Sequence, residues 1–130
     1  MGLTISESDC RGIPLFALNG EIDIYTVPQF LQAVEQVSRD APGIAVDLRD
    51  VSLVDSSGLG ALLRLAQTDG NWRPVVLVCT GPSIPRLLEL TKLADRFIVV
   101  DNVDDIDTAL ETASRERMDV SDGPPTGIPR

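Results

Sequence analysis

Residues 44–66 read IAVDLRDVSLVDSSGLGALLRLA, and this stretch decides the fold class. It begins with the β-rich run Ile44–Leu48 and changes, after Asp55-Ser56-Ser57-Gly58, to leucines and alanines at helical spacing. A second apolar run follows at Val75–Cys79, and its unbroken apolar character is typical of a strand that crossover helices bury on both faces. Strand, helix and buried strand in this order predict a parallel βαβ unit.

Two β-like runs lie before this unit. Leu3–Ser8 and Leu15–Asn19 alternate apolar with polar residues, and the turn residues near Asp9–Gly12 predict that the two runs pair as a hairpin. Gly20 breaks the pattern of the second run. The opening pair makes the predicted sheet mixed, because a hairpin is antiparallel.

Helical patterns, each with one apolar face, connect the predicted strands. Each pattern begins at a residue that favours a helix N-terminus. The expected capping residues are Thr26 (in a capping box with Gln29), Ser56 or Ser57, Ser83 and Asn102, and the last strand is expected at Phe97–Val100.

The elements run in the order ββαβαβαβα. This order predicts an α/β fold with a mixed, mostly parallel sheet of about five strands, covered by about four helices. We expect one domain over residues 1–117. Residues 118–130 contain Gly-Pro-Pro and no periodic apolar pattern, so they are expected to form a disordered tail.

The composition excludes several classes of function. The 130 residues include no histidine, so Ser-His-Asp groups, Cys-His groups and histidine-containing zinc sites cannot be assembled. Lys and Arg number 11 against 20 Asp and Glu, and the net charge of −9 argues against nucleic acid and anionic membranes as partners. The apolar runs are too short to cross a bilayer and Met1–Glu7 lacks the features of a secretory signal, so we expect a soluble, cytoplasmic protein.

Cys10 and Cys79 are the two cysteines of the chain. They are too few for a four-ligand metal site or a disulfide scaffold. We expect a surface thiol at Cys10 and a buried strand thiol at Cys79. No metal, cofactor or catalytic residue is expected.

The transition from strand to helix at Asp55, Ser56 and Ser57 is the most informative site in the sequence. Either serine could be the N-cap, and the free N–H groups of a helix start would tolerate a phosphate there. Gly58 and Gly60 follow where alanine would serve a helix better, so a neighbouring strand or a partner protein is expected to approach this turn closely. Taken alone, the tetrapeptide is most often only a helix cap.

Three blocks of sequence resemble the STAS-domain proteins of the anti-anti-sigma factor family, the bacterial anti-sigma factor antagonists. They are Leu18–Asp23 (LNGEID), Val46–Gly60 with its DSSGLG ending, and Val76–Val78 followed by Ser83–Leu90, and the resemblance extends over residues 3–115. The resemblance implies the STAS fold. It also implies a regulatory switch in transcription and the stress response, and not an enzyme.

Such proteins bind an anti-sigma factor that is also an ATP-using serine kinase, and this binding frees the sigma factor. The resemblance implies that the kinase phosphorylates the serine directly after the aspartate, which is Ser56, and so inactivates the protein. It implies further that a PP2C-type phosphatase restores the active form. The partner-binding residues implied are Asp23, Asp55, Ser56, Ser57, Gly58, Leu59 and Gly60.

Other interpretations stay open at this stage. A STAS adaptor that is not phosphorylated, acting as a scaffold or a subunit of a larger complex, would use Ser56 only as a cap. Asp23 could be a turn-forming carboxylate, and Tyr25 beside it is a further candidate for contact. A nucleotide-binding domain matches weakly, because Leu63 stands where a third glycine would be needed and no P-loop is present.

Overall fold

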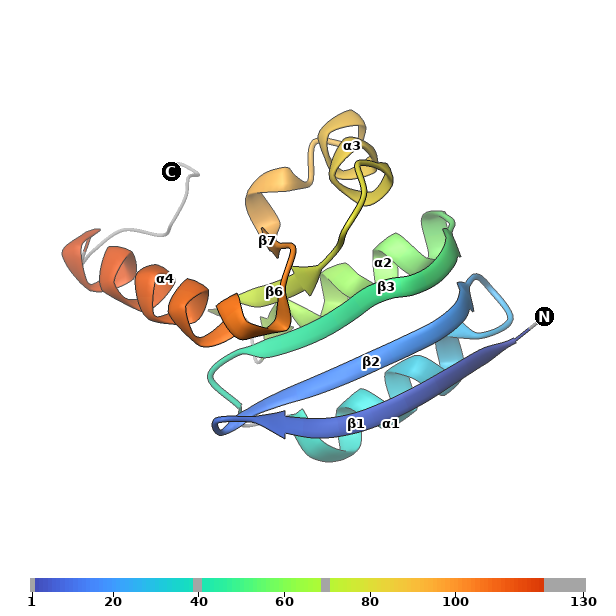
Figure 1. Cartoon of the computed structure of the whole chain (residues 1–130), viewed down its shortest axis with the longest axis horizontal. Coiled ribbons are helices and arrows are strands. Elements are labelled where there is room, and N and C mark those ends of the chain that lie inside the picture. Colours follow the sequence, from blue (N-terminus) through green and yellow to red (C-terminus); the bar gives the residue numbers. More distant parts are fainter. Residues whose placement is uncertain (1, 39–40, 69–70, 121–130) are drawn as a thin grey trace.

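A five-stranded sheet organises the computed structural model, which describes residues 2–38, 41–68 and 71–120 (Figure 1). The strands lie in the order β1-β2-β3-β6-β7. The pair β1–β2 is antiparallel and the other three pairs are parallel. The strand bounds are β1 Leu3–Cys10, β2 Ile13–Ile22, β3 Ile44–Val54, β6 Val75–Val78 and β7 Ile98–Val100.

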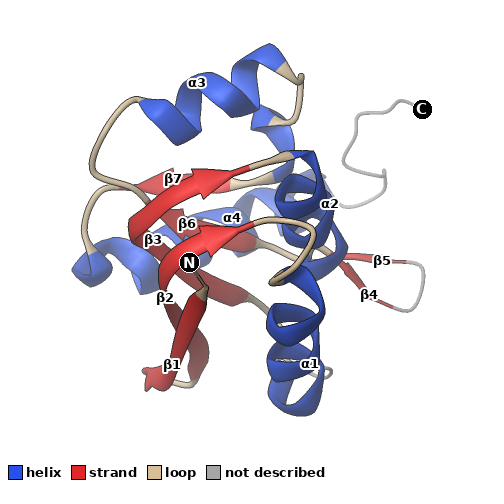
Figure 2. Cartoon of the chain, turned by 90° about the vertical axis from the view of Figure 1, so that its right-hand side faces the viewer, coloured by secondary structure: helices blue, strands red, loops and turns tan. Residues whose placement is uncertain are grey.

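Helices cover both faces of this sheet. Figure 2 shows α1 and α2 on one side of the strands and α4 on the other. The bounds are α1 Val27–Ser38, α2 Ser56–Leu65, α3 Ser83–Leu90 and α4 Ile106–Val120, with 3-10 turns η1 Ala94–Arg96 and η2 Val103–Asp105. The predicted fold class is therefore confirmed. Among the helices described, none has the length and apolar character needed to span a bilayer.

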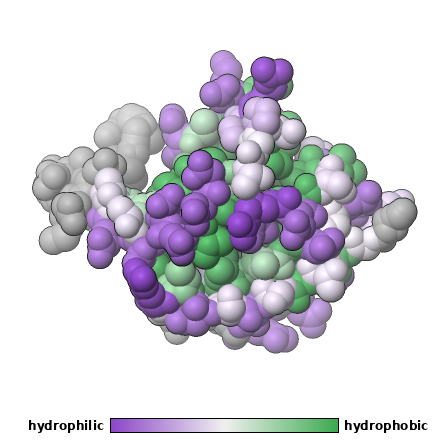
Figure 3. All heavy atoms as spheres, viewed as in Figure 1, coloured by the Kyte–Doolittle hydropathy of each residue, from purple (hydrophilic) through white to green (hydrophobic). Residues whose placement is uncertain are grey.

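Each face of the sheet carries its own apolar cluster. The larger cluster packs under α1, α2 and α3 and includes the fully buried Phe16, Phe30 and Leu62. The smaller one packs under α4 around Val76 and Ile106. All four residues of β6 are buried, as the unbroken apolar run predicts. In the view of Figure 3, hydrophilic side chains spread over the face that bears α4, and apolar atoms show between them.

The end of β2 differs from the prediction. The strand passes through Gly20 and continues to Ile22, with a shift of its pairing with β3 between Gly20 and Glu21. Gly20 has a φ of +125°, and a Cβ there would lie 2.1 Å from the carbonyl oxygen of Gly2. Glycine is thus required for a bulge within the strand and does not end it. This continuation carries β2 to the start of α2.

Three helix starts also differ from the sequence interpretation. The predicted capping box is absent, because Thr26 Oγ1 donates to the Glu21 carbonyl at 2.8 Å and Gln29 donates to the Leu3 carbonyl at 3.0 Å. Pro82, not Ser83, holds the N-cap position of α3. The third, at α2, belongs to the functional site. Asn102 caps as predicted, through Oδ1 and the Asp104 N–H at 2.9 Å, although it starts η2 ahead of α4.

Some elements were not predicted from the sequence. The two-residue strands β4 (Gln67–Thr68) and β5 (Asn71–Trp72) pair with each other apart from the main sheet. Strand β3 runs to Val54, well past the predicted Leu48. Helix α4 continues to Val120, past the domain boundary expected after residue 117, and the rest of the expected tail (121–130) lies outside the described residues.

Candidate functional site

At the junction between β3 and α2, the Ser56 side chain is exposed and does not cap the helix. Asp55 is the N-cap, with extended backbone (φ −96°, ψ −171°) and Oδ1 accepting from the Gly58 N–H at 3.0 Å. The expectation that a serine caps this helix is therefore wrong, because the Asp55 carboxylate is the group that accepts from this amide. Ser56 is the first helical residue, is exposed, and its side chain makes no hydrogen bond to any residue that the structure describes.

The two glycines that follow have different surroundings. Gly58 is buried, and a Cβ there would lie 2.7 Å from the Ile22 carbonyl oxygen and 3.0 Å from Val54 Cγ1. The same Ile22 carbonyl accepts from the Asp55 N–H at 3.2 Å. The close approach predicted at Gly58 is thus made by the end of β2. Gly60 is exposed and a Cβ there would meet nothing within 4 Å, so the fold itself does not require glycine at this position.

Asp23 forms the turn that follows β2. Its Oδ1 accepts from the Tyr25 N–H at 2.9 Å and the Thr26 N–H at 3.1 Å. The Thr26 hydroxyl, in a residue only 8% exposed, closes the turn by accepting from the Asp23 N–H at 3.0 Å. The turn-forming interpretation of Asp23 is therefore confirmed. Because Ile22 is bonded to Asp55, this turn lies beside the start of α2, and both are at the right-hand end of the sheet in Figure 1.

The predicted site residues divide into an exposed set and a supporting set. Leu59 is only 7% exposed and belongs to the larger apolar cluster, so its side chain packs α2 onto the sheet and offers little surface to a partner. Gly58 is buried as well. Two of the predicted residues are exposed, Ser56 and Gly60, and they lie one helical turn apart on α2. The other three, Asp55, Ser57 and Asp23, are half-buried.

Ile24, which was not predicted to have a role, is 64% exposed in the Asp23 turn. Its neighbour Tyr25 is 87% exposed. The signal in the sequence was two large apolar residues in a turn, where small or polar residues are usual.

Because Asp55 caps α2 and Ser56 does not, the two residues should differ in their effect on stability. Asp55→Ala should lower the free energy of unfolding by about 1 kcal/mol, because the Gly58 N–H loses its capping partner. Ser56→Ala should change it by less than about 0.5 kcal/mol, since that hydroxyl caps nothing. Urea unfolding of both variants measures the two values, and equal losses would contradict the assignment of the cap.

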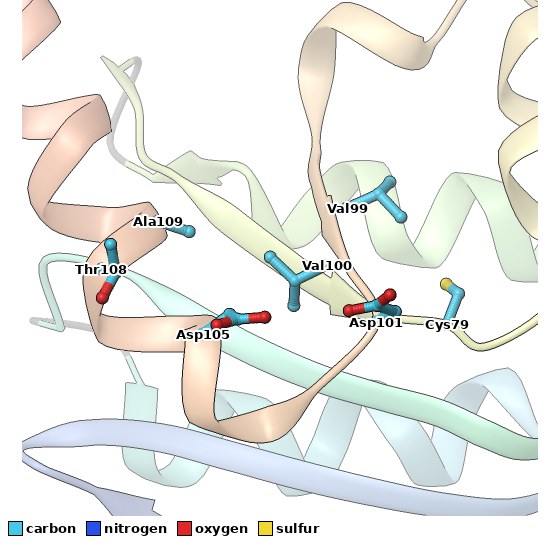
Figure 4. Close-up of a pocket in the computed structure, with 7 residues that line it drawn as sticks. All are labelled: Cys79, Val99, Val100, Asp101, Asp105, Thr108 and Ala109. Carbon is cyan, nitrogen blue, oxygen red and sulfur yellow. The ribbon is translucent and has the colours of Figure 1, made fainter.

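Away from this site, a hollow of about 490 Å³ lies between β7 and α4 (Figure 4). Its lining includes Cys79, Asp101 and Asp105, and it shares no residue with the Ser56 site. Burial, and then the nearby Asp47 carboxylate, raise the pKa of the Cys79 thiol to about 11, so this thiol is protonated and unreactive at neutral pH. No group of three or more metal-ligating side chains occurs within the described part of the chain.

The chain matches a family model, curated relatives and solved structures. The STAS domain family model matches residues 9–106. The anti-sigma-B factor antagonist of Listeria monocytogenes is 33% identical over 111 residues, covering 80% of this chain and 91% of that protein. A solved anti-sigma factor antagonist from Mycobacterium paratuberculosis has a TM-score of 0.70 and 30% identity, covering 84% of this chain and 94% of that one.

A second solved structure, of the anti-sigma factor antagonist SpoIIAA in its unphosphorylated form, has a TM-score of 0.63 at 20% identity, covering 81% of this chain and 95% of that one. At that identity the match bears on the fold alone, and it agrees with the five-stranded sheet described above. The chain therefore belongs to the STAS-domain family, and the Listeria and Mycobacterium relatives named above are anti-sigma factor antagonists.

Proposed function

We propose that this protein is a cytoplasmic, phosphorylation-controlled anti-sigma factor antagonist and not an enzyme. In its unphosphorylated form it binds a kinase-type anti-sigma factor, and the sigma factor is released. The kinase then transfers a phosphoryl group from ATP to the Ser56 hydroxyl, and a PP2C-type phosphatase removes it again.

The observation that carries this proposal is the position of Ser56. The residue is exposed and its hydroxyl takes no part in capping α2, so an enzyme can reach and modify it without breaking the helix cap. The chain has no histidine to activate this serine as a nucleophile, which suits the role of a substrate hydroxyl. A phosphate at the first residue of a helix is also favourable to the helix, because the free N–H groups and the dipole attract an anion.

The electrostatics support an on–off switch. Phosphorylation adds about −1.5 to −2 charge at pH 7. Asp55 and the Asp23 turn already make this surface acidic, and a dianion between them repels acidic groups of the partner and blocks its close approach to α2. Gly60, one turn further along the exposed side of α2, leaves the helix backbone open to close approach.

Phosphorylation can be tested by incubating the full chain with ATP and each kinase-type anti-sigma factor of the source genome, followed by intact mass measurement. We expect a mass gain of one phosphoryl group for the wild-type protein and for Ser57→Ala, and none for Ser56→Ala. Ser57 is the matched control, because it is the same residue type one position away and half-buried.

A mass gain that persists in Ser56→Ala would refute the assigned site. If no kinase-type anti-sigma factor modifies or binds the wild-type protein, the switch proposal fails, and an adaptor that is not phosphorylated becomes the better description.

A further inference from the structure

Two adjacent large apolar side chains stand in solvent at the turn between β2 and α1. Ile24 is 64% and Tyr25 is 87% exposed, whereas the other exposed large apolar residues of the described chain occur singly. Exposing such a pair brings no gain to the folded domain. An exposed apolar pair of this kind instead suits burial against another molecule.

The turn that carries this pair is fixed in shape. Val27 N–H donates to the Asp23 carbonyl at 2.9 Å, in addition to the bonds that the Asp23 carboxylate and the Thr26 hydroxyl make within the turn. None of these bonds involves the side chain of Ile24 or Tyr25. The two side chains are therefore presented on an ordered backbone, so this protein loses little backbone conformational entropy when a partner binds them.

The charge around the pair indicates the chemistry of the partner. Residues 18–30 and 50–60, which form this end of the sheet, contain no Lys or Arg. They carry the carboxylates Glu21, Asp23, Asp50 and Asp55. A complementary surface has an apolar pocket for the pair, with basic side chains opposite the carboxylates of the turn, Glu21 and Asp23.

We propose that Ile24 and Tyr25 are the apolar anchor with which this protein selects its kinase-type anti-sigma factor. This inference rests on the proposed function, and it goes beyond it by assigning affinity and partner choice to two side chains that are not modified. The tip of the turn is two residues beyond Ile22, whose carbonyl is bonded to Asp55, so a kinase that holds the anchor also has Ser56 within reach. The anchor acts in binding and takes no part in phosphoryl transfer.

Steady-state phosphorylation of the full chain separates binding from transfer. The assay uses the kinase-type anti-sigma factor that phosphorylates the wild-type protein, with Tyr25→Ala and Ile24→Ala as variants. We expect the KM for each variant to rise about tenfold to thirtyfold while kcat stays unchanged, because an anchor contributes equally to the ground state and the transition state. Leu90→Ala is the matched control, since Leu90 is 75% exposed at the end of α3, and its KM should not change.

The outcomes are distinguishable from a failure of the proposed function. If the wild-type protein is phosphorylated but Tyr25→Ala and Ile24→Ala keep the wild-type KM, the anchor is refuted while the switch stands. An equal rise in KM for Leu90→Ala would also overturn it, because the effect would then not be specific to the turn. Thermal unfolding checks that the variants are folded, and unchanged melting temperatures are expected because the turn is closed by backbone groups and by Asp23 and Thr26.

Discussion

The Ser56-phosphorylated protein should bind its kinase-type anti-sigma factor roughly a hundredfold more weakly than the unmodified protein. This corresponds to about 3 kcal/mol, a size reached when like charges are brought together at an interface. Ser56→Asp should lose about tenfold, because one carboxylate has about half the charge of a phosphate and fewer oxygens. Ser56→Ala should bind as tightly as the unmodified protein and stay bound in the presence of ATP. Titration calorimetry with purified proteins gives all of these affinities.

A control is needed to separate local repulsion from the added net charge. Ser8 is exposed on β1 and pairs with Leu15, at the opposite end of the sheet from Ser56. Ser8→Asp adds the same charge to the same chain and should bind like the wild-type protein. Salt is a second test, since the loss for Ser56→Asp should shrink as ionic strength rises and screens the repulsion. A loss for Ser56→Asp no larger than for Ser8→Asp would contradict the electrostatic explanation.

Adding one methyl group at Gly58 or at Gly60 should have opposite effects on stability. Gly58→Ala should lower the free energy of unfolding by about 3 kcal/mol, because the new Cβ meets the Ile22 carbonyl oxygen at 2.7 Å and Ile22 Cγ2 at 2.9 Å. That carbonyl is held by the Asp55 N–H, so it cannot move away without breaking a bond. Gly60→Ala should raise the free energy of unfolding by about 0.5–1 kcal/mol, since alanine favours a helix and has open space there.

Urea unfolding of the two variants measures this contrast, and each variant is the control for the other. If Gly58→Ala is as stable as the wild-type protein, β2 does not approach α2 as closely as described. Gly60→Ala also tests whether Gly60 belongs to the partner-binding surface. If this variant is more stable but binds its partner less well, the missing side chain at position 60 serves contact with the partner. Unchanged affinity of Gly60→Ala would remove Gly60 from that surface.

Patterns that depend on burial were predicted well from the sequence. The apolar run at Val75–Cys79 identified β6, and the change of periodicity after Asp55 identified the β3–α2 junction. These signals are strong because all the residues of a pattern together indicate which faces of the strand or helix are buried. Ser56 lies at this junction, as the first residue of α2, and it is exposed.

Features that depend on single hydrogen bonds were predicted less well. Thr26 and Gln29 have the residue types and spacing of a capping box, but tertiary partners in β1 and β2 take both side chains. Gly20 has the character of a strand end, and only the shifted pairing of β2 with β3 shows that it is a bulge within the strand. Asp55 and the two serines are all good N-caps, and local sequence cannot decide among them.

The turn after β2 has a consequence for cells that contain several such regulators. Its geometry depends on Asp23, Thr26 and the backbone. The side chains at positions 24 and 25 make none of the hydrogen bonds that close the turn. Gene duplicates could therefore exchange these two residues freely and acquire separate partners without any cost to folding. Two such regulators in one cell would then bind different partners because they differ at positions 24 and 25.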